Sequence, residues 1–560
     1  MLASEAAAQG SAGVRIARPG CVRLGGGTLK DGNPVGPTEP PPAPVVAEDV
    51  GRVKAELVDA FASMLDRLFD GVDDGSATQR ALEIQLWKEL LVVGRLALAY
   101  LFGLLSWKAT QQDLKLRGLG RDDVRLRLDR GYWGTLMTTL GPVTFPFFAY
   151  RDPSSGVATV TRTPAKESVF PYHSHCRSSV LCLEWQTRSG AAHPFRRAEE
   201  ELAFFTQGSI TTEDTTIAKH LVRVASMIDR SWLYKEPDEI RDILRNRATK
   251  DQQTGKPIIY ASSDAHAERR YVDDTWRAQW KMVNGIRIWC EDRETGQIVH
   301  LGGEFTWGDC HEVKKAFEAL IEARTLPKDG DYGDGVVAQL AWISDAMPWF
   351  DDHILPLFPD ATVILDVYHL IRWFSVLAAI LFKAGSKAAK KLVRSAEEAI
   401  FGPTAKRSRA PTPRRGHKKR RMRALKHAHD HASRKYVDVA RSGDRLAKAL
   451  LDLLTPLSPK KKNAKEELEA LGNRICNNVL RMGYQALLSR GFQIGSGAME
   501  SIHRTGCQLR AKLPGARWLE ETAQAIFNVR MLQLVGNWDA FWKPGRSPQA
   551  ARRRLPRSNC

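Results

Sequence analysis

Acidic side chains stand at the ends of three short apolar segments in the middle of this sequence. Asp264, Asp345 and Asp366 each close or directly follow such a segment. Carboxylates gathered in one place repel one another unless cations neutralise them, and their hard oxygen atoms suit Mg²⁺ or Mn²⁺. Two such ions can activate an attacking hydroxyl group and stabilise the leaving oxygen of a phosphodiester. The acids are therefore candidates for metal-dependent phosphodiester chemistry, provided that the fold brings them together.

The segments around these acids have the order of a ribonuclease-H-like α/β fold. Strands are predicted at 256–264, 280–290, 297–305, 336–344 and 361–365, and helices at 311–324, at 351–358 and from about 369 onward. In that fold the first and fourth strands lie side by side, and buried parallel strands appear as short apolar runs. We therefore expect Asp264 and Asp345 to converge at the carboxyl ends of these two strands.

Alternatives remain open for two of the acids. Asp273 and Asp274 compete with Asp264 for the first position, although the polar residues 266–270 before them are predicted to form a loop. Asp366 is predicted either to reach the same site or only to cap the helix that it precedes.

A further acid lies in the segment 495–504, which reads Gly-Ser-Gly-Ala-Met-Glu-Ser-Ile-His-Arg. The glycines and Ser496 predict a helix start with Ser496 as N-cap, which places Glu500 in or near the first turn. An acid there also stabilises the helix dipole, and this structural role is the alternative for Glu500 taken alone. Arg504, one turn later, is a candidate phosphate contact.

Three segments together resemble the DDE transposases of bacterial insertion sequences, most closely the ISKra type. They are Trp342–Asp345, Ile364–Leu370 with its Asp-x-Tyr-His pattern, and a stretch that runs from Gly495–Ser501 through Arg517-Trp518 and Asn528–Arg530 to Trp538–Trp542. The resemblance covers residues 190–545 and implies a metal-binding catalytic triad on Asp264, Asp345 and Glu500. It also implies two Mg²⁺ or Mn²⁺ ions, with Asp366, His369 and Arg504 as active-site neighbours.

The resemblance further implies an activity and its partners. A DDE transposase cuts double-stranded DNA at transposon ends and joins a freed 3′-hydroxyl group to target DNA, and a homo-oligomer is expected. Ala265 and Ala346 stand where the family commonly has glycine. A catalytically inactive DNA-binding protein on the same fold therefore stays an alternative, as does a ribonuclease-H-like nuclease or resolvase.

The positive charge of the chain is concentrated in one segment. The formal net charge is +19, and residues 383–435 contain 18 Lys and Arg residues against three acids, a net +15. This segment falls in an expected α-helical insertion, residues 383–490, between the second and third acids. A basic segment of this kind suits a polyanion such as DNA. The candidate DNA contacts are Arg414, Arg415, Lys418, Lys419, Arg420, Arg421 and Arg423.

The sequence divides into seven predicted parts. They are a disordered leader (1–50), a helical region with a small β hairpin (51–190), a helical unit with a candidate helix-turn-helix (191–255), the first part of the core (256–382), the basic insertion (383–490), the second part of the core (491–545) and a basic tail (546–560). The hairpin is expected to pair 143–150 with 157–163.

The sequence favours a cytoplasmic protein, and the family resemblance implies a bacterial one associated with the nucleoid. The eight cysteines are scattered, as in proteins with reduced thiols, and no signal peptide is predicted. The apolar runs 90–107 and 363–382 contain charged residues and are interpreted as buried elements, so no membrane partner is expected. The cluster His173, His175, Cys176 and Cys182 matches no standard zinc-finger spacing.

Overall fold

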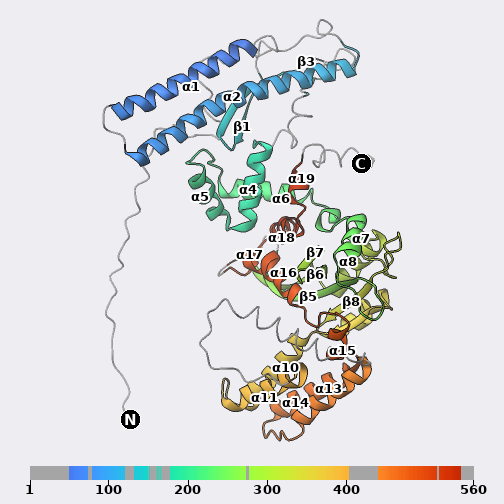
Figure 1. Cartoon of the computed structure of the whole chain (residues 1–560). Coiled ribbons are helices and arrows are strands. Elements are labelled where there is room, and N and C mark those ends of the chain that lie inside the picture. The colour runs from blue at the N-terminus through green and yellow to red at the C-terminus, as the bar shows by residue number, and fades with distance from the viewer. Residues whose placement is uncertain are drawn as a thin grey trace, which may run out of the picture.

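The computed structural model describes residues 50–73, 78–119, 132–148, 150–151, 161–162, 164, 177–272, 277–402, 439–513, 516 and 518–543. Within these ranges the chain is a mixed α/β protein. A helical N-terminal part leads to a central sheet, and a second helical part follows on the other side of that sheet (Figure 1).

The central sheet has five strands in the order β7-β6-β5-β8-β9. The strands are β5 (Ile258–Val272), β6 (Arg277–Glu291), β7 (Ile298–Trp307), β8 (Gln339–Ser344) and β9 (Thr362–Leu365). The pairs β5/β6 and β6/β7 are antiparallel, whereas β5/β8 and β8/β9 are parallel. The predicted adjacency of the first and fourth strands is therefore confirmed.

Strand β8 is buried on both faces, as an apolar central strand must be. Trp342 packs against Phe317 of α8 (Cys310–Glu322), with ring centroids 4.9 Å apart. Ile343, its neighbour in the chain, belongs to the core on the opposite face with Phe374 of α10 (Val367–Leu381). The crossover between the parallel strands β8 and β9 contains α9 (Pro348–His353). The sheet is thus covered on both faces, and the acids lie just beyond the point where the pairing of its central strands β5 and β8 ends.

Strand β5 is longer than predicted. It pairs with β6 up to Val272 and Arg277, so the residues 266–270 are strand rather than loop. The loop prediction is wrong because Asp264, His266 and Glu268 alternate with the small residues Ala265 and Ala267, which fits a strand, and because β6 supplies the hydrogen bonds that let the strand continue to Val272. Asp264 therefore lies within β5 and not at its end. Asp273 and Asp274 lie outside the described residues.

The predicted N-terminal hairpin is present only in part. Most of its first strand forms β2 (Gly141–Phe147), which pairs with β1 (Tyr132–Thr138), whereas its last residue, Tyr150, pairs with Arg162 as predicted. The turn is the short Thr139-Leu140 connection, where the Thr138 hydroxyl donates to the carbonyl oxygen of Gly141. Two residues of the predicted second strand, Thr161 and Arg162, form β4 and pair with β3 (Tyr150–Arg151).

The N-terminal part also contains a long helical pair, α1 (Val50–Asp73) and α2 (Gln79–Leu116), at the top of Figure 1. By length and composition α2 could cross a membrane, the one such helix in the described ranges, and 28% of its apolar window is buried. The predicted helix is confirmed, but its expected burial is not, because Leu101 is 54% and Leu105 45% exposed. The expectation of no membrane partner stays a prediction.

The residues before the core form the predicted helical unit. Its helices are α4 (Val180–Ala192), α5 (Phe195–Phe205), α6 (Asp214–Ala225), the short 3₁₀ helix η3 (Arg230–Leu233) and α7 (Pro237–Asn246). The turn between α5 and α6 contains Gln207 and Gly208, both with positive φ. The two helices that the sequence predicts are present, and their reading of DNA stays a prediction.

The insertion is helical where it is described. Its elements are α11 (Lys387–Phe401), α13 (Val439–Leu454), α14 (Lys462–Asn477), η6 (Val479–Arg481) and α15 (Tyr484–Ser489), which pack against α10 at the lower end of Figure 1. The candidate DNA contacts between 414 and 423 lie outside the described residues.

The chain then returns to the sheet through a broken helix. α16 (Gly497–Ile502) continues into the π-helix η7 (His503–Gln508) and α17 (Leu509–Ala511). α18 (Glu520–Val535) and α19 (Trp538–Trp542) follow and contribute to the core under β7.

Candidate functional site

Asp264 and Asp345 occupy equivalent positions on two neighbouring parallel strands. The last paired residues of β5 and β8 are Ala261 and Trp342, and each acid lies three residues beyond its strand's member of that pair. The Ser262 hydroxyl, which donates to the Ile343 carbonyl oxygen at 2.8 Å, holds the strands together just before they diverge. The parallel register thus brings together two acids that are far apart in the sequence.

The surroundings of Asp345 favour its protonated form. Burial raises the pKa of Asp345 above its ordinary value, and the nearby charge of Asp264 raises it further, while His369 opposes both effects. Ala346, directly after Asp345, has a φ of 61°, so the chain turns sharply at the carboxyl end of β8. Two carboxylates in this position repel each other, and a bound cation would relieve the repulsion.

Both carboxylate oxygens of Asp366 accept hydrogen bonds. As the N-cap of α10 it accepts from the Tyr368 backbone N–H at 2.9 Å, and its second oxygen accepts from His369 Nδ1 at 2.8 Å and from the Ser496 hydroxyl. Burial raises the pKa of Asp366, but the bonds from His369, Ser496 and Tyr368 outweigh it, so the net shift is downward. Asp366 is therefore the capping and positioning residue that one of the two predictions describes.

His369 links this capping carboxylate to the acid pair. The hydrogen bond with Asp366 raises the pKa of His369, burial opposes it, and the charges of Asp345 and Asp264 raise it further. Its side chain is 22% exposed, whereas that of Asp366 is 1% exposed. The predicted neighbours Asp366 and His369 thus lie at the site with both acids.

The Gly-Ser-Gly segment docks onto the Asp-x-Tyr-His segment. A Cβ atom on Gly495 would lie 2.5 Å from the Tyr368 ring, so only glycine fits there. The Val367 backbone N–H also donates to the Ile494 carbonyl oxygen at 3.0 Å. Ser496 is the N-cap residue of α16, as predicted, but its side chain makes no capping hydrogen bond to the helix. Its hydroxyl binds Asp366 instead, because that buried carboxylate is the stronger acceptor.

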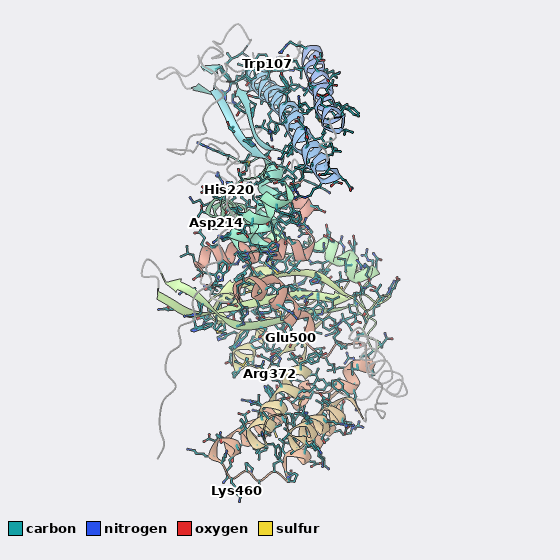
Figure 2. The ribbon with its side chains drawn as sticks, turned by 90° about the vertical axis from the view of Figure 1, so that its left-hand side faces the viewer. Trp107, Asp214, His220, Arg372, Lys460 and Glu500 are labelled. Atoms are coloured by element: carbon teal, nitrogen blue, oxygen red, sulfur yellow. The ribbon has the colours of Figure 1, made fainter. Side chains whose placement is uncertain are left out.

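Glu500 lies in the first turn of α16, as predicted, and its side chain is exposed. Figure 2 shows it where the sheet meets the helices that follow β9. His503, one turn later, approaches the Asp264 carbonyl oxygen to 3.0 Å through Nε2. The helix of Glu500 is therefore fastened beside Asp264. The Glu500 carboxylate makes no hydrogen bond or ion pair with another described residue.

The face of β5 that carries Asp264 is the face that α16 and η7 cover. Asp264 pairs with Gly285 of β6, and paired residues of antiparallel strands present their side chains on the same face. A Cβ atom on Gly285 would lie 2.5 Å from His503 Nε2 and 2.6 Å from the Met499 methyl group. The glycine leaves room for these helices, so that the acids of β5 and α16 share one side of the sheet.

The remaining predicted site residues are Arg504 and the His/Cys cluster. Arg504 is exposed on η7. Cys182 of the predicted His/Cys cluster is buried in a small apolar core, and its partners 173–176 lie outside the described residues. The described cysteines, Cys182, Cys290, Cys310, Cys476 and Cys507, form no disulfides.

A second polar cluster on the same strand was not anticipated from the sequence. His266 and Glu268 follow Asp264 at every second position, and with His503 and Cys507 they form a buried group. Burial lowers the pKa of His503 to about 4, against a smaller opposing effect of Asp264. The alternation Asp264-Ala-His-Ala-Glu268 was the available signal, since a period of two places all three side chains on one face of a strand.

Comparison with known proteins adds little. No protein-family model matches the chain, and no curated protein matches it. Among solved structures it is similar to one titled "Drosophila P element transposase strand transfer complex". The TM-score is 0.26 and the identity 12%, over 64% of this chain and 92% of that chain. A TM-score this low does not establish a shared fold.

Proposed function

We propose that this chain is a DDE transposase on a ribonuclease-H-like core, which cleaves DNA at transposon ends and joins it to target DNA. The observation that carries the proposal is the register of β5 and β8, which places Asp264 and Asp345 at equivalent positions of neighbouring parallel strands. The strand order of the sheet, three antiparallel strands followed by two parallel ones, supports the same core.

The residues present suit divalent ions with hard oxygen ligands. Asp264, Asp345 and Glu500 would hold Mg²⁺ or Mn²⁺, and their exposed or half-buried positions leave room for DNA. When bound, the ions supply Lewis-acid activation of a water or 3′-hydroxyl nucleophile and stabilise the leaving oxygen. The raised pKa of Asp345 comes first from burial and then from the charge of Asp264, and a divalent ion at this position would favour the ionised carboxylate.

Several residues of this chain would position these ligands. Asp366 holds both His369 and, at the start of α16, Ser496 through one carboxylate oxygen. Gly495 packs against Tyr368, and His503 binds the Asp264 carbonyl oxygen. These contacts hold α16, and with it Glu500, on the side of the sheet that carries Asp264. Positioning of this kind is what a metal-dependent displacement needs, because small shifts of ligands cost large factors in rate.

The insertion is the proposed DNA-binding part outside the catalytic core. Its basic segment would contact phosphates through Lys418–Arg423, and binding should then weaken steeply as salt rises. Replacing these residues by alanine or glutamine should weaken binding and flatten its salt dependence. An unchanged salt dependence would place the DNA path elsewhere.

The decisive experiment compares wild type with Glu500→Gln on DNA that carries the element's own terminal repeats, in the presence of Mg²⁺. The variant should bind DNA as wild type does and should lose cleavage and strand transfer. Glu521→Gln is the matched control, since Glu521 is also an exposed acid in the first turn of a C-terminal helix. Equal cleavage by wild type and Glu500→Gln would refute the catalytic proposal and leave a DNA-binding protein.

A further inference from the structure

Three side chains with metal-binding atoms meet between β5 and η7. His266 Nε2 lies 2.8 Å from Glu268 Oε1 and 3.2 Å from Cys507 Sγ. The three ligand atoms all lie within 4.8 Å of one another. The side chains of His266 and Glu268 are 9% and 3% exposed, and Cys507 is fully buried. The group is therefore enclosed, unlike the half-buried acid pair at the end of the β5/β8 pairing.

The hydrogen bonds of His266 and His503 determine which nitrogen of His266 carries the lone pair that faces Glu268 and Cys507. A carbonyl oxygen only accepts, so His503 Nε2 must donate to the Asp264 carbonyl oxygen. In the neutral ring His503 Nδ1 is then an acceptor, and its neighbour at 2.7 Å, His266 Nδ1, must be the donor. His266 Nε2 consequently carries a lone pair that points toward Glu268 and Cys507. A histidine ligand prepared for a metal ion has the same arrangement, with its second nitrogen donating outward.

One oxygen of this cluster lacks the partner that burial normally demands. Glu268 Oε1 is buried and makes no hydrogen bond among the described residues, although it lies beside His266 Nε2. Two lone pairs that face each other at this distance need a positive centre between them. Such a centre is a proton or a metal ion, and the thiol of Cys507 completes a set of donors around it.

We propose that His266, Glu268 and Cys507 bind a zinc ion through Nε2, a carboxylate oxygen and Sγ. Imidazole, carboxylate and thiolate are the ligands that Zn²⁺ takes in proteins, whereas a thiolate does not suit Mg²⁺. One thiolate and one carboxylate balance the two charges of the ion, so the buried complex is neutral. Tetrahedral zinc needs ligand atoms roughly 3.3–3.6 Å apart, from bond lengths of about 2.0–2.3 Å, so the distances of 2.8 and 3.2 Å from His266 Nε2 to Glu268 Oε1 and Cys507 Sγ need to widen by only about half an ångström.

The ion would fasten the Glu500 helix to the sheet. Cys507 lies in the π-helix that continues α16, and His266 and Glu268 lie on β5 two and four residues after Asp264. π-helical turns are rare and occur mostly at functional sites. A structural zinc here is independent of the proposed function. It would nevertheless hold the helix that carries Glu500 against the strand that carries Asp264. A second group of possible ligands, Asp309, Cys310 and His311, is largely exposed at a helix start and carries no such argument.

The test is a titration of the metal-free full-length protein with Co²⁺ as a spectroscopic probe, followed by competition with Zn²⁺. Wild type should bind one equivalent of Co²⁺ with thiolate-to-metal charge-transfer absorption and the visible bands of a tetrahedral ion, and Zn²⁺ should displace it. Cys507→Ala should abolish the charge-transfer absorption. Cys290→Ala should retain it, because Cys290 is an equally buried free cysteine away from the cluster.

A further variant covers the case in which Cys507→Ala does not fold. Glu268→Gln keeps the size of the side chain and should raise the Kd for Zn²⁺ at least about tenfold. An unchanged Kd in that folded variant would overturn the proposal. So would the absence of a charge-transfer band in wild type, its persistence in folded Cys507→Ala, or its loss in Cys310→Ala, which would assign the ion to the exposed group.

Discussion

One face of strand β5 carries two polar clusters that differ in almost every physical respect. Asp264 and Asp345 lie where the parallel pairing of β5 and β8 ends, with oxygen ligands, partial exposure and repulsion between like charges. His266 and Glu268 lie further along the same face and meet Cys507 in a closed interior with mixed ligands. Both clusters draw on side chains at every second position of β5, which share one face of the strand. The elements that pack against this face determine the chemistry of each cluster. Where the sheet opens, the site suits hard ions and a substrate, and where η7 covers it, the site suits a softer, permanent ion.

The largest expected effect separates the two clusters by activity. Asp345→Asn removes a ligand of the open cluster and should lower Mg²⁺-dependent cleavage by roughly 10³-fold, because metal stabilisation of the transition state amounts to several kcal/mol. The Co²⁺ spectrum of the closed cluster should be unchanged. Asp352→Asn, at an exposed position on the nearby α9, is the control for both measurements. Loss of both properties in Asp345→Asn would mean that the clusters are one site.

Stabilisation of the protein by zinc should depend on the closed cluster and not on the open one, the reverse of the effect on activity. Zn²⁺ at a hundred times its Kd should stabilise wild type by about 2.7 kcal/mol, since it binds only the folded state. Thermal unfolding monitors this effect, which should be absent in Cys507→Ala and retained in Asp345→Asn. Stabilisation of Cys507→Ala by zinc to the same extent would contradict the assignment of the closed cluster.

The link between the open cluster and the Glu500 helix should have a smaller effect. Ser496→Ala removes a hydroxyl donor from the buried Asp366 carboxylate and should lower the free energy of unfolding by about 1–3 kcal/mol. Denaturant unfolding measures the change. Ser501→Ala, at an exposed position of the same short helix, should change stability by less than about 0.5 kcal/mol. Equal values for the two variants would mean that the Asp366 bond does not fasten α16.

The smallest expected effect is the pH dependence that the pairing of His369 with Asp366 gives to the open cluster. The pKa of His369 is raised above its ordinary value of 6.5, so its pairing with Asp366 stabilises the fold fully below that value. The contribution should decline as pH rises through the higher pKa of the folded state. At the acid end, the lowered pKa of Asp366 means that its contribution is lost as pH falls below 3.8 through its folded value.

Unfolding measurements of wild type and His369→Gln between pH 5 and pH 9 test this. The stability difference between the two proteins should be largest at pH 6 and below and should shrink above pH 7. A difference that does not vary with pH would show that His369 acts only by packing. The neutral His503 of the closed cluster, whose pKa is lowered to about 4, acts in the opposite sense: stability falls as pH falls below 6.5, because the unfolded state then binds a proton that the folded state does not. This contribution is common to wild type and His369→Gln, so it cancels in the difference between them.

Much of the open cluster could be predicted from the sequence. Short apolar runs that end in acids located β5, β8 and β9, and the order of the elements predicted that β5 and β8 are neighbours, as the structure confirms. The helix start before Glu500 was also predicted correctly, because glycine and serine next to an apolar run are local signals. The catalytic roles of Asp264, Asp345 and Glu500 stay predictions.

The sequence by itself determined where strands and helices form and which acids stand at their ends, because periodicity and turn residues act over a few positions. Only the tertiary structure decided how far β5 runs, since its polar second half depends on hydrogen bonds from β6. Only packing decided that Ser496 binds Asp366 rather than its own helix. The closed cluster joins β5 to a cysteine 241 positions further along the chain from His266. A contact of that separation has no local sequence pattern, because it exists only once α16 and η7 have docked on the sheet.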